Sequence, residues 1–213
     1  MFEFKGFTEK EYLQRLQKLQ DLLTAKGLDL AVLNTGVDLY YYTGSVLPLY
    51  LFVPVKSKPF MLARKATDQI RTSVCHLKLE VFSGSKDLTN IFESVGLRAE
   101  RIGFNFAATS YSTVTRMLGF FDQAEPIDIS MELKTLRMCK SAAEISIQEE
   151  AGRIIAGFPE TAKKSFKPGM TELELSQKIE EYFRLNGNDI ITTKQEGMVI
   201  AYEVCYAGTN SMA

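Results

Sequence analysis

Cys75 and the single histidine of the chain, His76, are the side chains that could act as a nucleophile and its base. They lie in a segment that we predict to be helical, and sequence neighbours on a helix point in different directions, so the imidazole could not activate the thiol. We expect a core cysteine beside a surface or capping histidine. The Ser83-Gly84-Ser85 stretch lacks the Gly-x-Ser-x-Gly spacing of a nucleophile elbow, which indicates a loop and no hydrolase triad.

Metal-assisted hydrolysis needs several convergent carboxylate or imidazole ligands. Three carboxylates in the last part of the chain are too scattered to nominate, namely Asp189, Glu196 and Glu203. The sequence also contains no Gly-x-Gly-x-x-Gly and no Walker-type loop, which excludes the usual nucleotide-binding sites. It therefore nominates no catalytic residue and no metal ligand within these 213 residues.

The composition is that of a soluble globular protein, with 46% hydrophobic and 24% charged residues. The 25 Lys+Arg and 26 Asp+Glu residues give a net charge of −1 without a polybasic run, which argues against a nucleic-acid or membrane partner. Three widely spaced cysteines indicate reduced thiols. The N-terminus has no apolar stretch typical of a signal peptide. These features predict a cytoplasmic protein with a small neutral or peptide-like partner.

Helices and strands are expected to alternate over the first 130 residues. Thr8 begins a helix, with Glu11 expected to complete a capping box and Gly27 to end it. Leu49 to Val55 and Pro59 to Leu62 are expected to form a β-hairpin. Further strands are expected at residues 28–33, 79–82, 101–104 and 124–129, and further helices at 67–77, 87–95 and 110–118. This alternation predicts an α/β fold with a mixed, mostly parallel sheet.

A second unit is expected after the first 130 residues and a linker. Ser141 and Glu144 can form a capping box that begins a helix, and Thr171 and Glu174 can form another. A strand is expected within residues 198–206. Two helices and one strand cannot easily close a core of their own. We therefore divide the chain into a domain at residues 1–130, a linker at 131–141 and the beginning of a second domain at 142–213.

Four stretches of the chain carry a family resemblance. They are Tyr42-Thr43-Gly44, Leu136-Arg137-Met138-Cys139-Lys140-Ser141 leading to Glu144-Ile145, Lys167-Pro168-Gly169-Met170-Thr171-Glu172, and Gly208-Thr209-Asn210-Ser211. In order and spacing the chain resembles the pita-bread metallopeptidases, in particular the Xaa-Pro aminopeptidases (aminopeptidase P) and the Xaa-Pro dipeptidases (prolidases), with creatinase as a non-peptidase relative. The likeness extends over nearly the whole sequence.

The resemblance implies a creatinase-like N-terminal domain followed by the first part of an α+β pita-bread catalytic domain. It also implies a homodimer that hydrolyses the bond before proline in proline-containing peptides. In this family a water between two divalent metal ions (Mn, Co or Zn) attacks the carbonyl. The metal ligands are two aspartates, a histidine and two glutamates, all of which come after the position at which this chain stops.

The sequence departs from the family pattern because its one histidine, His76, lies in the first domain. Two interpretations fit. Either the 213 residues are part of a longer metallopeptidase and supply dimerisation and substrate restriction, or they form a non-catalytic dimerisation or interaction module. A creatinase-like hydrolase fragment also stays open. We prefer the longer metallopeptidase, because an incomplete second domain would expose apolar helix faces, and Phe158, Phe166, Tyr182 and Phe183 show no polar replacement.

Tyr42, Gly44 and Tyr50 are the candidates for a substrate pocket. In related dimers, the segment after the Tyr-Thr-Gly motif approaches the active site of the partner subunit. Residues 45–50 therefore form the loop expected to reach a second copy, and the alternative is a plain connection. The alternative for the tyrosines is packing against the sheet, and for Gly44 a turn.

Overall fold

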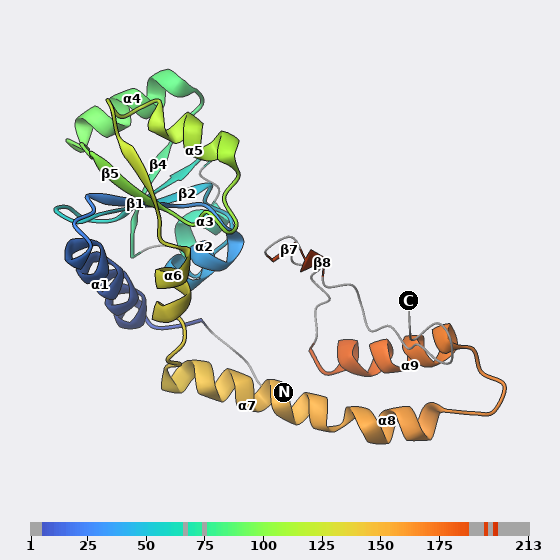
Figure 1. Ribbon diagram of the computed structural model, residues 1–213. Coiled ribbons are helices and arrows are strands. Elements are labelled where there is room, and N and C mark those ends of the chain that lie inside the picture. Colours follow the sequence, from blue (N-terminus) through green and yellow to red (C-terminus); the bar gives the residue numbers. More distant parts are fainter. Residues whose placement is uncertain (1–5, 66–67, 74–75, 188–193, 196–197, 200–213) are drawn as a thin grey trace. The chain divides into compact units, whose positions relative to one another are not determined.

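The computed structural model describes residues 6–65, 68–73, 76–187, 194–195 and 198–199 (Figure 1). The chain divides into two compact units, the first ending at Cys139 and the second continuing from Lys140. None of the helices within the described residues is long and apolar enough to span a membrane.

The first unit contains a six-stranded sheet in the order β4-β3-β2-β1-β5-β6. The strands are β1 (Leu30–Leu33), β2 (Tyr50–Pro54), β3 (Phe60–Ala63), β4 (Lys78–Val81), β5 (Arg101–Phe104) and β6 (Glu125–Asp128). Strand β1 pairs in parallel with β5, as β5 does with β6 and β3 with β4, whereas β2 is antiparallel to β1 and β3. The predicted α/β fold with a mixed, mostly parallel sheet is confirmed, and so is the predicted hairpin.

Helices cover both faces of this sheet (Figure 1). They are α1 (Glu9–Ala25), α2 (Gly36–Thr43), α3 (Asp68–Ser73), α4 (Ser85–Ser94), α5 (Tyr111–Leu118) and α6 (Ser130–Leu136). Alternate residues of β1 enter two separate cores. Ala31 and Leu33 pack with residues of α1, α2 and α6, whereas Leu30 and Val32 pack with residues of α4 and α5. The strand is therefore apolar at every position, as expected when both faces of a sheet are covered.

Helix α1 begins as predicted, because the Thr8 hydroxyl accepts a hydrogen bond from the Glu11 amide at 3.2 Å. The Glu11 carboxylate accepts a hydrogen bond from Arg15 at 2.8 Å. Helix α2 was not predicted from the sequence. It begins after Thr35, whose hydroxyl accepts a hydrogen bond from the Asp38 amide, and ends at Gly44.

The linker expected at residues 131–141 overlaps a short helix. Residues 130–136 form helix α6, because Leu133 is fully buried in the core next to α1 and anchors this segment to the first unit. Glu132 also forms an ion pair with Lys26, directly after α1. The first unit thus extends to Cys139, which lies within the stretch 131–141 where the linker is expected.

The second unit has helices α7 (Ala142–Ala156), α8 (Phe158–Ser165) and α9 (Glu172–Leu185), and short strands β7 (Lys194–Gln195) and β8 (Met198–Val199). Both predicted capping boxes form, at Ser141 with Glu144 and at Thr171 with Glu174. The Tyr182 hydroxyl donates to the Ile154 carbonyl at 2.7 Å. Most of the strand expected at residues 198–206, and the stretch from Gly208 to Ser211, lie outside the described residues.

Candidate functional site

A buried polar cluster surrounds Asp38 on α2, whose side chain has no solvent exposure. Its Oδ2 accepts hydrogen bonds from the Thr35 hydroxyl at 2.7 Å and from the Asn105 amide nitrogen at 2.8 Å. Its Oδ1 pairs with the guanidinium group of Arg137. The carboxylate is thus removed from water but provided with two hydrogen bonds and a counter-charge, which is how buried charges are tolerated.

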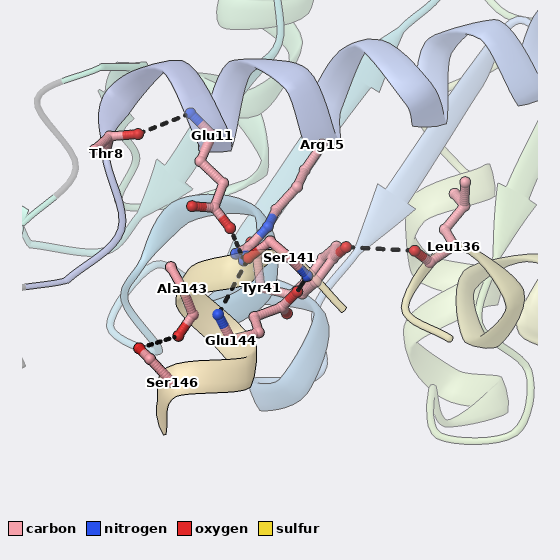
Figure 2. Close-up of polar contacts among 9 residues, drawn as sticks. All are labelled: Thr8, Glu11, Arg15, Tyr41, Leu136, Ser141, Ala143, Glu144 and Ser146. Carbon is pink, nitrogen blue, oxygen red and sulfur yellow. Dashed lines mark hydrogen bonds and ion pairs between the residues drawn. The ribbon is translucent and has the colours of Figure 1, made fainter. Parts of the chain in front are cut away.

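Arg137 connects two segments that are 99 residues apart in sequence. It directly follows α6, and only 19% of its side chain is exposed. Beside it, the Tyr41 hydroxyl donates to the Leu136 carbonyl at 3.4 Å (Figure 2). Two of the stretches singled out in the sequence, those around Tyr42 and Leu136, therefore meet in the first unit.

Arg15 of α1 holds the C-terminal end of α2. Its guanidinium donates to the Tyr41 carbonyl at 2.8 Å and pairs with Glu11 at 2.8 Å (Figure 2). It also lies over the rings of Tyr41 and Phe7, 4.2 and 4.1 Å from their centroids. Such cation–π contacts strengthen when the cation is desolvated, and Arg15 is only 5% exposed. Helix α2 is thus fixed by two arginines from different helical regions, Arg137 at its first turn and Arg15 near its C-terminal end.

Tyr42, the first predicted pocket residue, lies in the core beside α1 and α6 and has no exposed surface. Its hydroxyl has no hydrogen-bond partner among the described residues. Burial, together with the neighbouring Asp38 carboxylate, raises the pKa of Tyr42 far above its usual value. The side chain is placed as the packing alternative predicted.

Gly44, the second candidate, ends α2 in the left-handed conformation, with φ of 79°. A Cβ atom here would lie 2.5 Å from the Tyr12 hydroxyl oxygen, so both the backbone and the available space favour glycine. The Tyr12 ring in turn stacks on His76 with 4.8 Å between centroids. His76 is therefore a half-buried packing residue, while Cys75 lies outside the described residues.

Tyr50, the third candidate, begins β2 on the opposite face of the sheet from Tyr42. Its hydroxyl oxygen accepts a hydrogen bond from Arg116 at 2.6 Å, and the residue borders a cavity of about 260 Å³. The structure therefore does not bring Tyr42 and Tyr50 together. Between Gly44 and Tyr50 the chain presents exposed apolar side chains, with Val46 58% and Leu47 45% accessible.

A model of a known protein family matches the part of the chain that forms the first unit. The model of the creatinase/prolidase N-terminal domain matches residues 15–139, which is more than half of the chain. The chain belongs to the creatinase/prolidase N-terminal domain family. The match ends at Cys139, the last residue of the first unit, so this unit is the creatinase/prolidase N-terminal domain.

Relatives of this creatinase/prolidase chain are peptidases. It is 27% identical over 178 residues to the uncharacterized peptidase YqhT from Bacillus subtilis (strain 168), covering 82% of this chain and 50% of that protein. The structure resembles a Xaa-Pro dipeptidase from Bacillus anthracis (TM-score 0.73, 20% identity, 83% of this chain and 50% of that one). It also resembles a dipeptidase from Pyrococcus horikoshii OT3 (TM-score 0.65, 27% identity, 80% and 49%). The chain spans about half the length of these relatives.

A two-metal centre does not fit the described residues of this creatinase/prolidase chain. No three His, Cys, Asp or Glu side chains among them lie together in a way that could hold a metal ion. The buried Asp38 carboxylate already pairs with Arg137 and accepts hydrogen bonds from Thr35 and Asn105. The three scattered carboxylates noted in the sequence lie outside the described residues.

Sequence reasoning missed the members of the Asp38 cluster as site residues. Arg137 lay in a stretch that carried the family resemblance, but nothing pointed to its partner. The available local signal was Thr35 with Asp38 three residues later, a pattern that begins helices. Asn105 directly follows β5, where side chains of parallel strands gather at one edge of a sheet.

Proposed function

We propose that this chain supplies the N-terminal region of a metal-dependent Xaa-Pro peptidase, of the prolidase or aminopeptidase P type, that hydrolyses the bond before proline. The observation that carries the proposal is the family match over residues 15–139, a range that ends where the first folded unit ends. The peptidase relatives support it. Two divalent metal ions (Mn, Co or Zn), held by ligands other than the described residues, would supply the attacking water.

Within this proposal the Asp38 cluster has a mechanical role. Arg137 lies two residues before the end of the first unit, and its buried ion pair with Asp38 fixes that end against the sheet. The chain then continues at Lys140 into α7, whose first turn is closed by the Ser141 and Glu144 capping box.

The proposal includes a homodimer in which residues 45–50 reach the second copy. The segment is held at both ends: the Ser45 carbonyl accepts from the Thr43 hydroxyl at 3.0 Å, and Tyr50 is paired in β2. Its middle exposes Val46, Leu47 and Leu49, which is unusual unless an apolar surface covers them. Such a segment would restrict the length of peptide that enters the partner's active site, and Tyr50 is the candidate of the three that borders a cavity.

The cellular compartment is also part of the proposal. Three cysteines, an odd number at wide spacing, suit a reducing cytoplasm, and Cys139 is an exposed free thiol.

The test uses the gene product purified from its natural host, so that its full length is retained. We expect Mn²⁺-dependent cleavage of Xaa-Pro peptides and no cleavage of matched Xaa-Ala peptides. Equal cleavage of both would refute the proline specificity. Hydrolysis of creatine instead of peptides would favour the creatinase-like alternative. An intact mass of 24.0 kDa combined with a stable dimer and no hydrolysis would favour the non-catalytic module.

A further inference from the structure

A cavity on the α4 and α5 side of the sheet is distinct from the Asp38 cluster. It lies within the first unit and has a volume of about 260 Å³, a little below the usual range for small-molecule sites. Its lining comes from the start of β2, the ends of β3 and β4, and helices α4 and α5. The lining residues that matter here are Tyr50, Arg64, Phe82, Leu88, Arg116 and Phe120.

The polar side chains of this cavity are mainly hydrogen-bond donors. Arg64 makes no hydrogen bond or ion pair with any described residue, and its guanidinium lies 5.4 Å from the centroid of the Phe82 ring. Arg116 donates to the Tyr50 hydroxyl oxygen at 2.6 Å and has no carboxylate partner within the described residues. Because Tyr50 accepts this bond, its own O–H remains available to donate. Two guanidinium groups and a phenol therefore line one cavity, and the guanidinium groups have no carboxylate partner among the described residues.

Acidic groups do not neutralise this arrangement. No Asp or Glu is among the residues that line the cavity. The acid at the start of α4, Asp87, accepts hydrogen bonds from the amides of Ser83 and Gly84 at 2.8 and 3.4 Å, which closes the helix N-terminus. The uncompensated charge of the cavity is thus positive.

The apolar walls of the cavity indicate what kind of molecule could bind beside the two guanidinium groups. Phe82, Leu88 and Phe120 are apolar and line the same cavity as the two guanidinium groups. Arginine binds planar anionic groups through two parallel hydrogen bonds, which suits a carboxylate or a phosphate. We propose that this cavity is a binding site for a small organic anion, with its carboxylate or phosphate between Arg64 and Arg116 and an apolar body of about amino-acid to dipeptide size against the aromatic wall.

This inference does not rest on the proposed peptidase function, because every lining residue belongs to the first unit. The binding site would exist whether or not the parent protein cleaves Xaa-Pro peptides. Failure of one proposal would therefore leave the other standing.

The test is calorimetric titration of the chain at low ionic strength with four probes. N-acetyl-L-phenylalanine carries a carboxylate, phenyl phosphate carries a phosphate, N-acetyl-L-phenylalanine amide is neutral, and inorganic phosphate has no apolar body. We expect one of the two apolar anions to bind at least about tenfold more tightly than both the amide and inorganic phosphate, and binding to weaken with added salt. The tighter anion identifies the head group.

Variants then locate the site. Arg64→Gln and Arg116→Gln should each weaken binding about tenfold, and Tyr50→Phe severalfold. Arg98→Gln, an exposed arginine outside the cavity, is the matched control and should leave the affinity unchanged. Arg64 is exposed, so its variant tests the site even if Arg116→Gln unfolds, which circular dichroism would reveal. Affinities of both apolar anions no higher than that of the amide, no effect of Arg64→Gln, or no saturation up to about 10 mM would each overturn the proposal.

Discussion

The ion pair between Asp38 and Arg137 makes the sharpest prediction about stability. Replacing Arg137 by Met would leave the fully buried Asp38 carboxylate with two hydrogen bonds but without its counter-charge. Removing one partner of a buried pair typically costs about 3–5 kcal/mol. Because 19% of the Arg137 side chain is exposed, we expect a loss near the lower end, about 3 kcal/mol.

A double-mutant cycle isolates the pair from other contacts that each residue makes. In Asp38→Asn the carboxylate is replaced by a neutral amide, so Met at position 137 no longer strands a buried charge. The stability lost in the double variant should therefore be smaller, by about 2 kcal/mol, than the sum of the losses in the two single variants. Glu125→Gln is the control, because it removes an ion pair with Arg101 whose side chains are 43% and 63% exposed, and it should cost less than about 1 kcal/mol.

The assay is urea unfolding of the whole chain followed by far-ultraviolet circular dichroism, since the sequence contains no tryptophan. Hydrogen exchange of β1 and β5 amides would assign the change to the first unit. The reasoning fails if Arg137→Met costs no more than Glu125→Gln. It also fails if the two single losses add to within about 0.5 kcal/mol in the double variant.

Three further predictions concern single residues. Gly44→Ala should destabilise the first unit by about 2 kcal/mol or more, because Gly44 has a positive φ and an added Cβ would clash with Tyr12. Gly96→Ala is the control, since Gly96 also has a positive φ but open space around it, and it should cost about 1–2 kcal/mol. Equal losses of the two variants in urea unfolding would exclude the clash. Tyr42→Phe should leave stability unchanged or raise it by up to about 1 kcal/mol, because it removes a buried hydroxyl without a partner among the described residues. A clearly lower melting temperature of the variant would mean that the hydroxyl is hydrogen-bonded. The pKa of His76 is lowered by burial below its usual 6.5, so its contribution to stability is complete above that pH and is lost as the pH falls through the lower folded value. The single histidine gives one resolved imidazole signal for NMR titration, and a midpoint at or above 6.5 would contradict this prediction.

Much of the sheet could be predicted from the sequence because its strands are short apolar runs bounded by turn residues. Residues 50–54 and 60–63, for example, are buried at every position, and their connection contains Lys-Ser-Lys. Helix boundaries with Ser or Thr caps were equally readable, since a cap hydrogen bond depends on residues three positions apart. Such local signals do not require knowledge of the fold.

Helices α2 and α6 were missed because their stability comes from distant contacts. The sequence of α2 contains three consecutive tyrosines, which on their own favour a strand, but Leu39 and Tyr42 are buried against α1 and α6. In α6 the seven residues are too few to reveal a helical period. The Asp38 and Arg137 pair was beyond reach for the same reason, as its members lie 99 residues apart.

The two outermost strands determine how copies of this domain can associate. Edge strands β4 and β6 carry charged residues at Lys78, Glu80, Glu125 and Asp128, and Pro126 in β6 has no amide hydrogen to donate. A further strand is therefore poorly accepted at either side, and a continuous intermolecular sheet is disfavoured. Association would depend on side chains such as Val46 and Leu47, where single substitutions can tune or abolish it without disturbing the backbone hydrogen bonds of the fold.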